Sequence, residues 1–403
     1  MSPAVPRRRF LTGRGAAALL AGLLFVIAAN LLAAPILLYV AMLLFLLVVF
    51  AVLVVHAPRR SGPVTRRIST DLLTVGEVSQ VAVRFDMRAL RIPHGIWRDH
   101  LPPAVSGDAS GEFPTDNGTN IRYAITGVRR GVWAVGPLSL HTIDPFGFAQ
   151  RVQEFGETRT VTVVPEVVPL APLSSNIGAA GGTAHTASTR LGQGSDNLSP
   201  RLYVSGDSMR RIHWRATAHR GDLMVRQEEE ESSPDALVVL DRTAARWAHQ
   251  REGADPAFEA AVSACASIAL HLVQEGYSVD VLDSAGTMLG RLRGHEDDRD
   301  GLLVALALAR PQGVGRDIIT LFDGTPPGPL VLITGHLDEE DAALLRHGGA
   351  AAPIMLATDL GPGAADAAAR LGWSSAPLSE DVAAAWEDAL PARMATGGGH
   401  VAR

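Results

Sequence analysis

The sequence contains a single cysteine, Cys265, among its 403 residues. One cysteine excludes an internal disulfide framework and a zinc site built from four cysteines. Cys265 lies in an apolar, alanine-rich stretch, AAVSACASIAL, so we interpret it as a small core side chain. A lone cysteine also fits a reducing compartment.

An excess of positive charge is absent as well. Lysine and arginine total 36 against 42 aspartates and glutamates, so the formal net charge is -6 and the pI is near 6.1. Nucleic-acid-binding domains usually carry a basic excess. Neither a G-x-G-x-x-G loop nor a Walker-type loop occurs in the sequence. We therefore expect no nucleic-acid partner, and nucleotide binding has no support.

Charged residues are missing from a long run near the N-terminus. From Ala16 to Val55 the only strongly polar residue is Asn30. As one helix, these roughly 40 residues would measure about 60 Å, twice the hydrocarbon thickness of a bilayer. Pro35 disfavours helical continuation and Asn30 tolerates a turn. We therefore predict a transmembrane hairpin over residues 11–56. Its two spans are Leu11–Leu32 and Pro35–His56.

Arginines flank the hairpin on both sides. Arg7, Arg8 and Arg9 precede it, and Arg59, Arg60, Arg66 and Arg67 follow it. The positive-inside rule then places both flanks in the cytoplasm. We expect a two-pass cell-membrane protein whose basic segment, residues 1–10, and whose soluble domains are cytoplasmic. The alternative is a signal peptide with a Tat-like arginine cluster, but the apolar run is far longer than a signal core.

Residues 60–170 show strand alternation and no helical periodicity of useful length. Clusters of Gly, Pro, Asn and Asp separate the alternating stretches, which is typical of a small β-rich, sandwich-like domain. Residues 171–199 have too few large apolar side chains to pack a core, so we expect a flexible linker. The predicted strands are Thr74–Phe85, Asn120–Val128, Gly131–Leu140 and Thr158–Val164.

Residues 235–390 alternate short apolar strands with helices. This order predicts an α/β doubly wound domain with a mostly parallel sheet covered on both faces. Ligand sites in such sheets lie at the carboxyl ends of the strands, where Asp241 and Thr334 stand. Residues 391–403 are expected to be a disordered tail. The predicted strands are 236–240, 277–282, 287–292, 329–334, 352–357 and one at Trp373. The predicted helices are 256–274, 297–309, 338–347, 364–371 and 379–390.

The densest chemistry lies in residues 200–234. Within the stretch Leu202–Glu231, five arginines meet a run of four glutamates. We expect Asp207 to cap a helix over Ser208–Ala218. The plain interpretation is a surface helix, turn and strand tied by weak salt bridges. His213 and His219 are six residues apart, a poor spacing for joint metal ligation on a helix. A hydrolase using Asp207, His213 or His219 is the weakest hypothesis, since no nucleophile is paired with a base.

This segment closely resembles the signature of the "domain of unknown function 58" family, which reads approximately R-x-Y-x-x-G-D-x-x-R-x-I-x-W-x-x-x-A-R-x-G-x-L-x-V-R-x-x-E. His219 stands where the family usually has arginine. An upstream stretch is similar to the family's RG…GP…DPFG segment. The matching signature residues include Arg201, Tyr203, Gly206, Asp207, Arg210, Arg211, Ile212, Trp214, Arg220, Gly221, Arg226 and Glu228. The upstream matches are Arg130-Gly131, Gly136-Pro137, and Asp144, Pro145, Phe146 and Gly147.

The resemblance implies a membrane-anchored protein whose α/β domain is similar to von Willebrand factor type A. It implies a MoxR-type AAA+ ATPase as partner, and a transglutaminase-like membrane protein as a further one. A metal-binding type A domain carries D-x-S-x-S after its first strand. Here Asp241 and Thr243 fit, Ala245 has no oxygen ligand, and Arg242 places a cation beside the site. His336 replaces the later Asp, so the Mg²⁺ site is degenerate and we expect no cofactor.

Three functions remain open at this point. The first is an interaction module that partners the ATPase in complex assembly or cell-envelope processes, as the resemblance implies. The second is a metal-dependent ligand-binding domain. The third is the hydrolase. We expect changes at Gly206, Asp207, Arg210 or Trp214 to act on folding or on docking between the β-rich and α/β domains.

Overall fold

The computed structural model describes residues 10–56, 60–88, 94–112, 119–173, 198–203, 212, 214–228, 234–247, 255–313 and 328–390. Predictions for the basic N-terminal segment, for most of the linker and for residues 391–403 lie outside these ranges. The chain divides into two compact units. The first is Met1–Glu166 with Leu306–Leu308, and the second is Val167–Ala305 with Ala309–Arg403.

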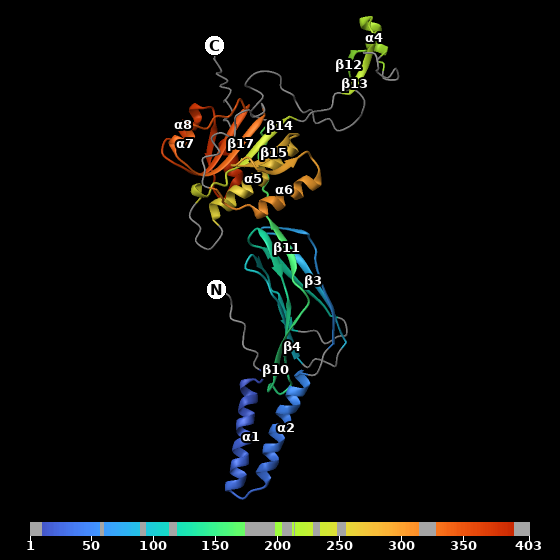
Figure 1. The fold of residues 1–403 in the computed structure, drawn as a ribbon, viewed down its shortest axis with the longest axis vertical. Helices are drawn as coiled ribbons and strands as arrows, with labels where there is room; N and C mark the ends of the chain where they lie inside the picture. Colours follow the sequence, from blue (N-terminus) through green and yellow to red (C-terminus); the bar gives the residue numbers. More distant parts are fainter. Residues whose placement is uncertain are drawn as a thin grey trace, which may run out of the picture. The chain divides into compact units, whose positions relative to one another are not determined.

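The predicted hairpin consists of two apolar helices, α1 (Gly13–Leu31) and α2 (Ile36–His56) (Figure 1). Both are long and apolar enough to cross a membrane. The break lies between the two predicted spans, but Asn30 does not form it. The Asn30 side chain donates to the Val26 carbonyl, at 3.2 Å, and stays within α1. Ala33 instead takes the left-handed conformation that reverses the chain, with φ of 49°.

The β-rich region of the first unit is built of three sheets, as alternation and turn residues predict. Their strand orders are β1-β3-β7-β5, β10-β9-β4-β6 and β2-β11-β8. Their inward side chains, including Leu73, Val81, Ile125 and Leu138, form one core. The strands are β1 (Arg60–Ile68), β2 (Leu72–Thr74), β3 (Val78–Arg88), β4 (His94–Asp99), β5 (Val105–Ser106), β6 (Ser110–Glu112), β7 (Thr119–Gly127), β8 (Gly131–Val135), β9 (Leu138–Ile143), β10 (Gln150–Phe155) and β11 (Arg159–Val164).

Two sequence expectations fail in this region. The stretch Gly131–Leu140 is two strands, β8 and β9, because Gly136, with φ of 100°, breaks it. Arg66, expected in the basic flank of the hairpin, is buried instead. Its guanidinium forms two hydrogen bonds with the Asp99 carboxylate, at 3.0 and 2.7 Å. Arg66 therefore contributes no charge to the membrane flank.

The second unit contains a six-stranded sheet of order β16-β15-β14-β17-β18-β19. All neighbouring strands are parallel except the edge strand β16, which is antiparallel to β15. The mostly parallel sheet is therefore confirmed. The strands are β14 (Asp235–Leu240), β15 (Ser278–Asp283), β16 (Met288–Leu292), β17 (Pro329–Leu337), β18 (Ala352–Leu360) and β19 (Ser374–Pro377).

Helices pack on both faces of this sheet (Figure 1). Leu237 and Val239 of β14 belong to one core cluster with alanines of α7 and α8, and α5 contacts β14 and its neighbours on the other face. The helices are α5 (Pro256–Gln274), α6 (Glu296–Leu308), α7 (Glu339–Ala342), α8 (Ala364–Arg370) and α9 (Val382–Ala389). α5 begins and ends where its apolar pattern predicts, whereas α7 is a single turn instead of the expected 338–347.

Cys265 is a core residue of α5, as expected. Its burial raises the pKa of the thiol to about 12, so the sulfur is protonated and unreactive at neutral pH. α5 meets the length and hydropathy criteria for a membrane span, but more than half of that span is buried inside the unit.

The predicted linker begins inside the second unit. The Leu173 backbone N–H donates to Glu275 Oε1, at 2.8 Å. The indole of Trp386 donates to the Ala171 carbonyl, at 2.8 Å. Residues 171–173 are thus held by hydrogen bonds with Glu275, at the end of α5, and with Trp386, on α9. The start of the predicted linker therefore packs within the second unit although it has few large apolar side chains.

Candidate functional site

Asp241 follows β14 at the carboxyl edge of the sheet and is fully buried. Its Oδ1 accepts the Thr243 backbone N–H, at 2.9 Å, and its Oδ2 accepts the Thr334 hydroxyl, at 2.7 Å. The parallel order of β14 and β17 brings these residues together from positions about 90 apart in sequence. The structure therefore joins the three oxygen-bearing residues that the sequence placed at this edge.

A fourth group completes the cluster, and sequence reasoning missed it. Arg246 lies on the short 3-10 turn Ala244–Arg246 and its side chain is 8% exposed. Its Nε lies 3.1 Å from Asp241 Oδ2, and its Nη2 donates to Asp341 Oδ2, at 2.7 Å. Its Nη1 donates to the His336 carbonyl, at 3.2 Å. The buried charge of Asp241 is thus neutralised by an arginine of the same loop.

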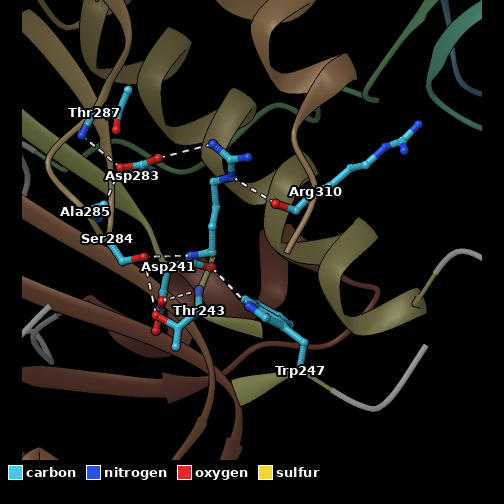
Figure 2. Close-up of polar contacts among 9 residues, drawn as sticks. Asp241, Thr243, Trp247, Asp283, Ser284, Ala285, Thr287 and Arg310 are labelled. Carbon is cyan, nitrogen blue, oxygen red and sulfur yellow. Dashed lines mark hydrogen bonds and ion pairs between the residues drawn. The ribbon is translucent and has the colours of Figure 1, made fainter. Parts of the chain in front are cut away.

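A second carboxylate lies at the end of the neighbouring strand (Figure 2). Asp283 Oδ1 accepts the backbone N–H groups of Ala285 and Thr287, at 3.0 and 2.8 Å. Its Oδ2 accepts Arg242 Nη1, at 3.1 Å. Arg242, expected beside Asp241, therefore turns toward β15, and its Nε donates to the Arg310 carbonyl, at 3.0 Å. The cation at Asp241 is Arg246, not Arg242.

These residues do not fit a Mg²⁺ site. Mg²⁺ requires near-octahedral oxygen ligands and usually keeps several waters. Both Asp241 oxygens already accept protein donors, and Arg246 supplies the positive charge. The His336 side chain pairs with Asp359, its Nδ1 2.7 Å from Oδ2. Within the described ranges, no group of three or more His, Cys, Asp or Glu side chains is placed to hold a metal ion.

Trp247 closes the cluster from the side (Figure 2). Its indole N–H donates to the Asp241 carbonyl, at 3.1 Å, and its ring meets Phe258 edge-on, with centroids 4.9 Å apart. Gly335 packs so closely on the Arg246 carbonyl that a Cβ there would overlap it. The cluster is therefore closely packed and inward-facing. It leaves Ala244, Ala245 and the His336 side chain on the surface above it.

The signature residues form a small element of their own. β12 (Leu198–Leu202) pairs antiparallel with β13 (Met224–Glu228), which carries Arg226 and Glu228. Tyr203 extends this pairing, since its N–H donates to the Leu223 carbonyl, at 2.8 Å. Ile212 bridges to Val225, and both are buried. Gly206, Asp207, Arg210, Arg211 and His213 lie outside the described residues.

The helix of this element, α4 (Trp214–Arg220), begins six residues later than expected. Thr217 ties it to β13, because its hydroxyl oxygen accepts the Met224 N–H, at 3.0 Å. Gly221 then ends the helix with φ of 81°. Trp214 is 67% exposed, outside the small core of the element, and His219 and Arg220 are exposed as well.

The upstream DPFG residues form the turn between β9 and β10. The Asp144 carboxylate accepts the backbone N–H groups of Phe146 and Ala149, at 2.8 and 2.6 Å. Gly147 takes φ of 72°, which favours glycine. Pro145 occupies the second position of this turn, where its fixed φ is favourable. The motif is thus a self-capped tight turn.

Comparison with known proteins identifies the signature. Residues 199–326 match the model of a family described as "Protein of unknown function DUF58". The match confirms the family resemblance read from the signature. No curated protein matches the chain.

Two solved structures share weak similarity. A crystal structure of a protein of unknown function from Porphyromonas gingivalis W83 is 15% identical, with a TM-score of 0.20, over 26% of this chain and 48% of that one. Cwp6 from Clostridium difficile is 7% identical, with a TM-score of 0.19, over 78% of this chain and 37% of that one. The chain spans less than half of either structure, and such TM-scores carry no argument about the fold.

Proposed function

We propose that this DUF58-family chain is a membrane-anchored protein-interaction module whose partner is a MoxR-type AAA+ ATPase. Its α/β unit then acts as a type A-like domain that recognises protein and not a metal-bound ligand. In this proposal the chain performs no catalysis, and its soluble units lie on the cytoplasmic side, where an ATPase can reach them. A transglutaminase-like membrane protein is a further candidate partner.

The exposure of Trp214 carries the proposal. The small element needs Ile212, Met224 and Val225 for its core, and Trp214 lies outside it. Tryptophan and arginine are the residue types most enriched among the energetic centres of protein interfaces. An exposed tryptophan on the same short helix as the exposed Arg215 and Arg220 is therefore better suited to a partner surface than to folding.

The closed cluster at Asp241 supports the same function. Type A-like domains that bind through a metal need an open coordination site at this strand edge. Here Arg246 and Trp247 fill the space around the carboxylate with protein groups. A contact at this edge then uses the surface above the cluster, where the His336–Asp359 pair is exposed.

The test is direct binding between purified components. The full chain in lipid nanodiscs is mixed with the MoxR-type ATPase of the same cell, with ATP and with ADP. We expect nucleotide-dependent binding that Trp214→Ala weakens by at least about tenfold, as for an interface centre. Met288→Ala is the matched control, because Met288 is also a large exposed apolar residue, on β16. Absence of binding by the unaltered chain, or equal loss in both variants, would contradict the proposal.

A further inference from the structure

The Asp144–Phe148 turn of the β-rich region lies against the ends of the two apolar helices. The Thr12 N–H donates to the Phe148 carbonyl, at 3.0 Å, and the Gln150 N–H donates to the Phe10 carbonyl, at 3.1 Å. Leu11 forms an isolated antiparallel bridge with Ala149. The chain entering α1 is therefore joined to the turn by backbone hydrogen bonds.

The start of α1 is shaped to receive this turn. The Thr12 hydroxyl oxygen accepts the Gly15 N–H as the helix cap, at 3.1 Å, and the hydroxyl donates to the Gly147 carbonyl, at 2.5 Å. A Cβ at Gly15 would overlap the Phe148 carbonyl oxygen, whereas Gly13 has open space around it. One side chain thus serves both the helix and the turn, and one glycine permits their contact.

The end of α2 holds the other side of the turn. Ala51 and Val55 of α2 form a small core with Ala149, against which Phe148 packs. The ring of His56 lies 5.4 Å from that of Phe10. Both helices therefore end on the same turn, and Asp144 keeps the turn closed from within.

What the turn leaves exposed suits the surface of a bilayer. Phe146 is 47% exposed, and the exposed Arg14 side chain lies beside Gly147. α1 and α2 have 19 and 21 residues, so each crosses the hydrocarbon core once and ends near the headgroups. Aromatic rings and snorkelling arginines concentrate in that layer.

We propose that the Asp144–Phe148 turn is a membrane-interface anchor. Its occupant is the phospholipid headgroup layer of the bilayer that holds the hairpin, and Phe146 inserts into that layer. The inference rests on the membrane anchoring in the proposed function, but it is independent of the ATPase. It gives the DPFG motif a role: to seat the β-rich region on the hairpin at the water boundary.

The position of the turn can be measured with a fluorophore on a new cysteine. Cys265 is fully buried, so the label reacts selectively with Phe146→Cys. Val128→Cys is the control, because Val128 is 50% exposed and follows β7 beside β11. Figure 1 shows β10 next to the helices and β11 at the far end of the β-rich region.

Both variants are reconstituted in phosphatidylcholine and phosphatidylglycerol vesicles with nitroxide-labelled headgroups. We expect quenching at position 146 at least about twice that at position 128. Equal quenching at both positions would overturn the anchor. Resistance to carbonate extraction reports insertion of the hairpin separately. An extractable chain would overturn both the anchor and the membrane part of the proposed function, whereas equal quenching in an inserted chain removes the anchor alone.

A second pair of variants tests how the turn is held. In the Phe146→Cys background, Gly15→Ala should reduce the quenching at position 146, because the added Cβ displaces Phe148. Gly13→Ala should leave it unchanged. Full quenching in the Gly15→Ala variant would overturn the docking of the turn on α1.

Discussion

Two buried arginine–aspartate clusters, one in each unit, consist of the same kind of ion pair but have different structural roles. Arg66 lies between sheets, where its guanidinium meets Asp99 and the carbonyls of Val135 and Glu157. Tyr123 donates its hydroxyl to the same carboxylate. Arg246 lies at the carboxyl edge of a parallel sheet, where ligand sites form, and joins the carboxylate of Asp241, which follows β14, to that of Asp341 on α7. The first cluster fixes a core, and the second closes a site.

The largest effect should come from breaking the cluster in the β-rich unit. Asp99→Asn leaves the Arg66 charge buried without its counter-charge, which should cost about 3–5 kcal/mol of unfolding free energy. Chemical denaturation of the detergent-solubilised chain measures it. The control is Asp280→Asn, which weakens surface pairs with Arg291 and Arg293 and should cost less than about 1 kcal/mol. Similar losses in both variants would show that the Arg66 cluster has no special weight.

Breaking the Arg246 cluster at the sheet edge should cost less unfolding free energy, because the loop there can relax and admit water. Arg246→Ala should cost up to about 3 kcal/mol. It also removes the cation that neutralises Asp241, so millimolar Mg²⁺ should raise the melting temperature of the variant but not of the unaltered chain. Stabilisation of the unaltered chain by Mg²⁺ would show that the site is open, contrary to the comparison.

The signature element differs from both clusters, because its described residues include no buried charge cluster. Ile212→Ala should destabilise this element by about 2 kcal/mol, because Ile212 is buried against Val225. Trp214→Ala should change stability by less than about 0.5 kcal/mol, as expected for an exposed side chain. Hydrogen exchange of residues 198–228 distinguishes them. A large loss of protection in Trp214→Ala would make Trp214 a folding residue.

The smallest effect concerns alkaline pH. Burial, and then the hydrogen bond to Asp99, raise the pKa of Tyr123 above its usual value near 10. The folded state therefore holds a proton that the unfolded state releases, so this stability is complete below about pH 10 and is lost above it. Tyr123→Phe should flatten this part of the pH dependence and cost about 1 kcal/mol at neutral pH. An unchanged alkaline slope in Tyr123→Phe would assign it to other groups.

The parts of the fold that sequence predicted depend on long, repetitive patterns. The apolar run required two helices, and the pattern of α5 marked both of its ends. The positions of single polar residues could not be predicted in this way. Arg66 matched the basic flank in composition, but β1 carries it into the core opposite Asp99, a pairing over 33 positions that no local pattern encodes.

The candidate site was predicted in part for the same reason. Asp241 and Thr334 were placed by the rule that parallel strands share their carboxyl edge. Arg246 was missed because its role depends on a short turn that brings its side chain back to Asp241. An arginine five residues after such an aspartate is the signal that could have indicated it.

The contact between Thr12, Gly15 and the Asp144–Phe148 turn also has a mechanical meaning. Only three residues separate His56 from Arg60, so the β-rich region has a short tether at α2 and a hydrogen-bonded joint at α1. A pulling force on the β-rich region would therefore pass into both helices together, with little slack at the bilayer. In the proposed function, work done by the ATPase on the soluble part would therefore tilt or displace the hairpin.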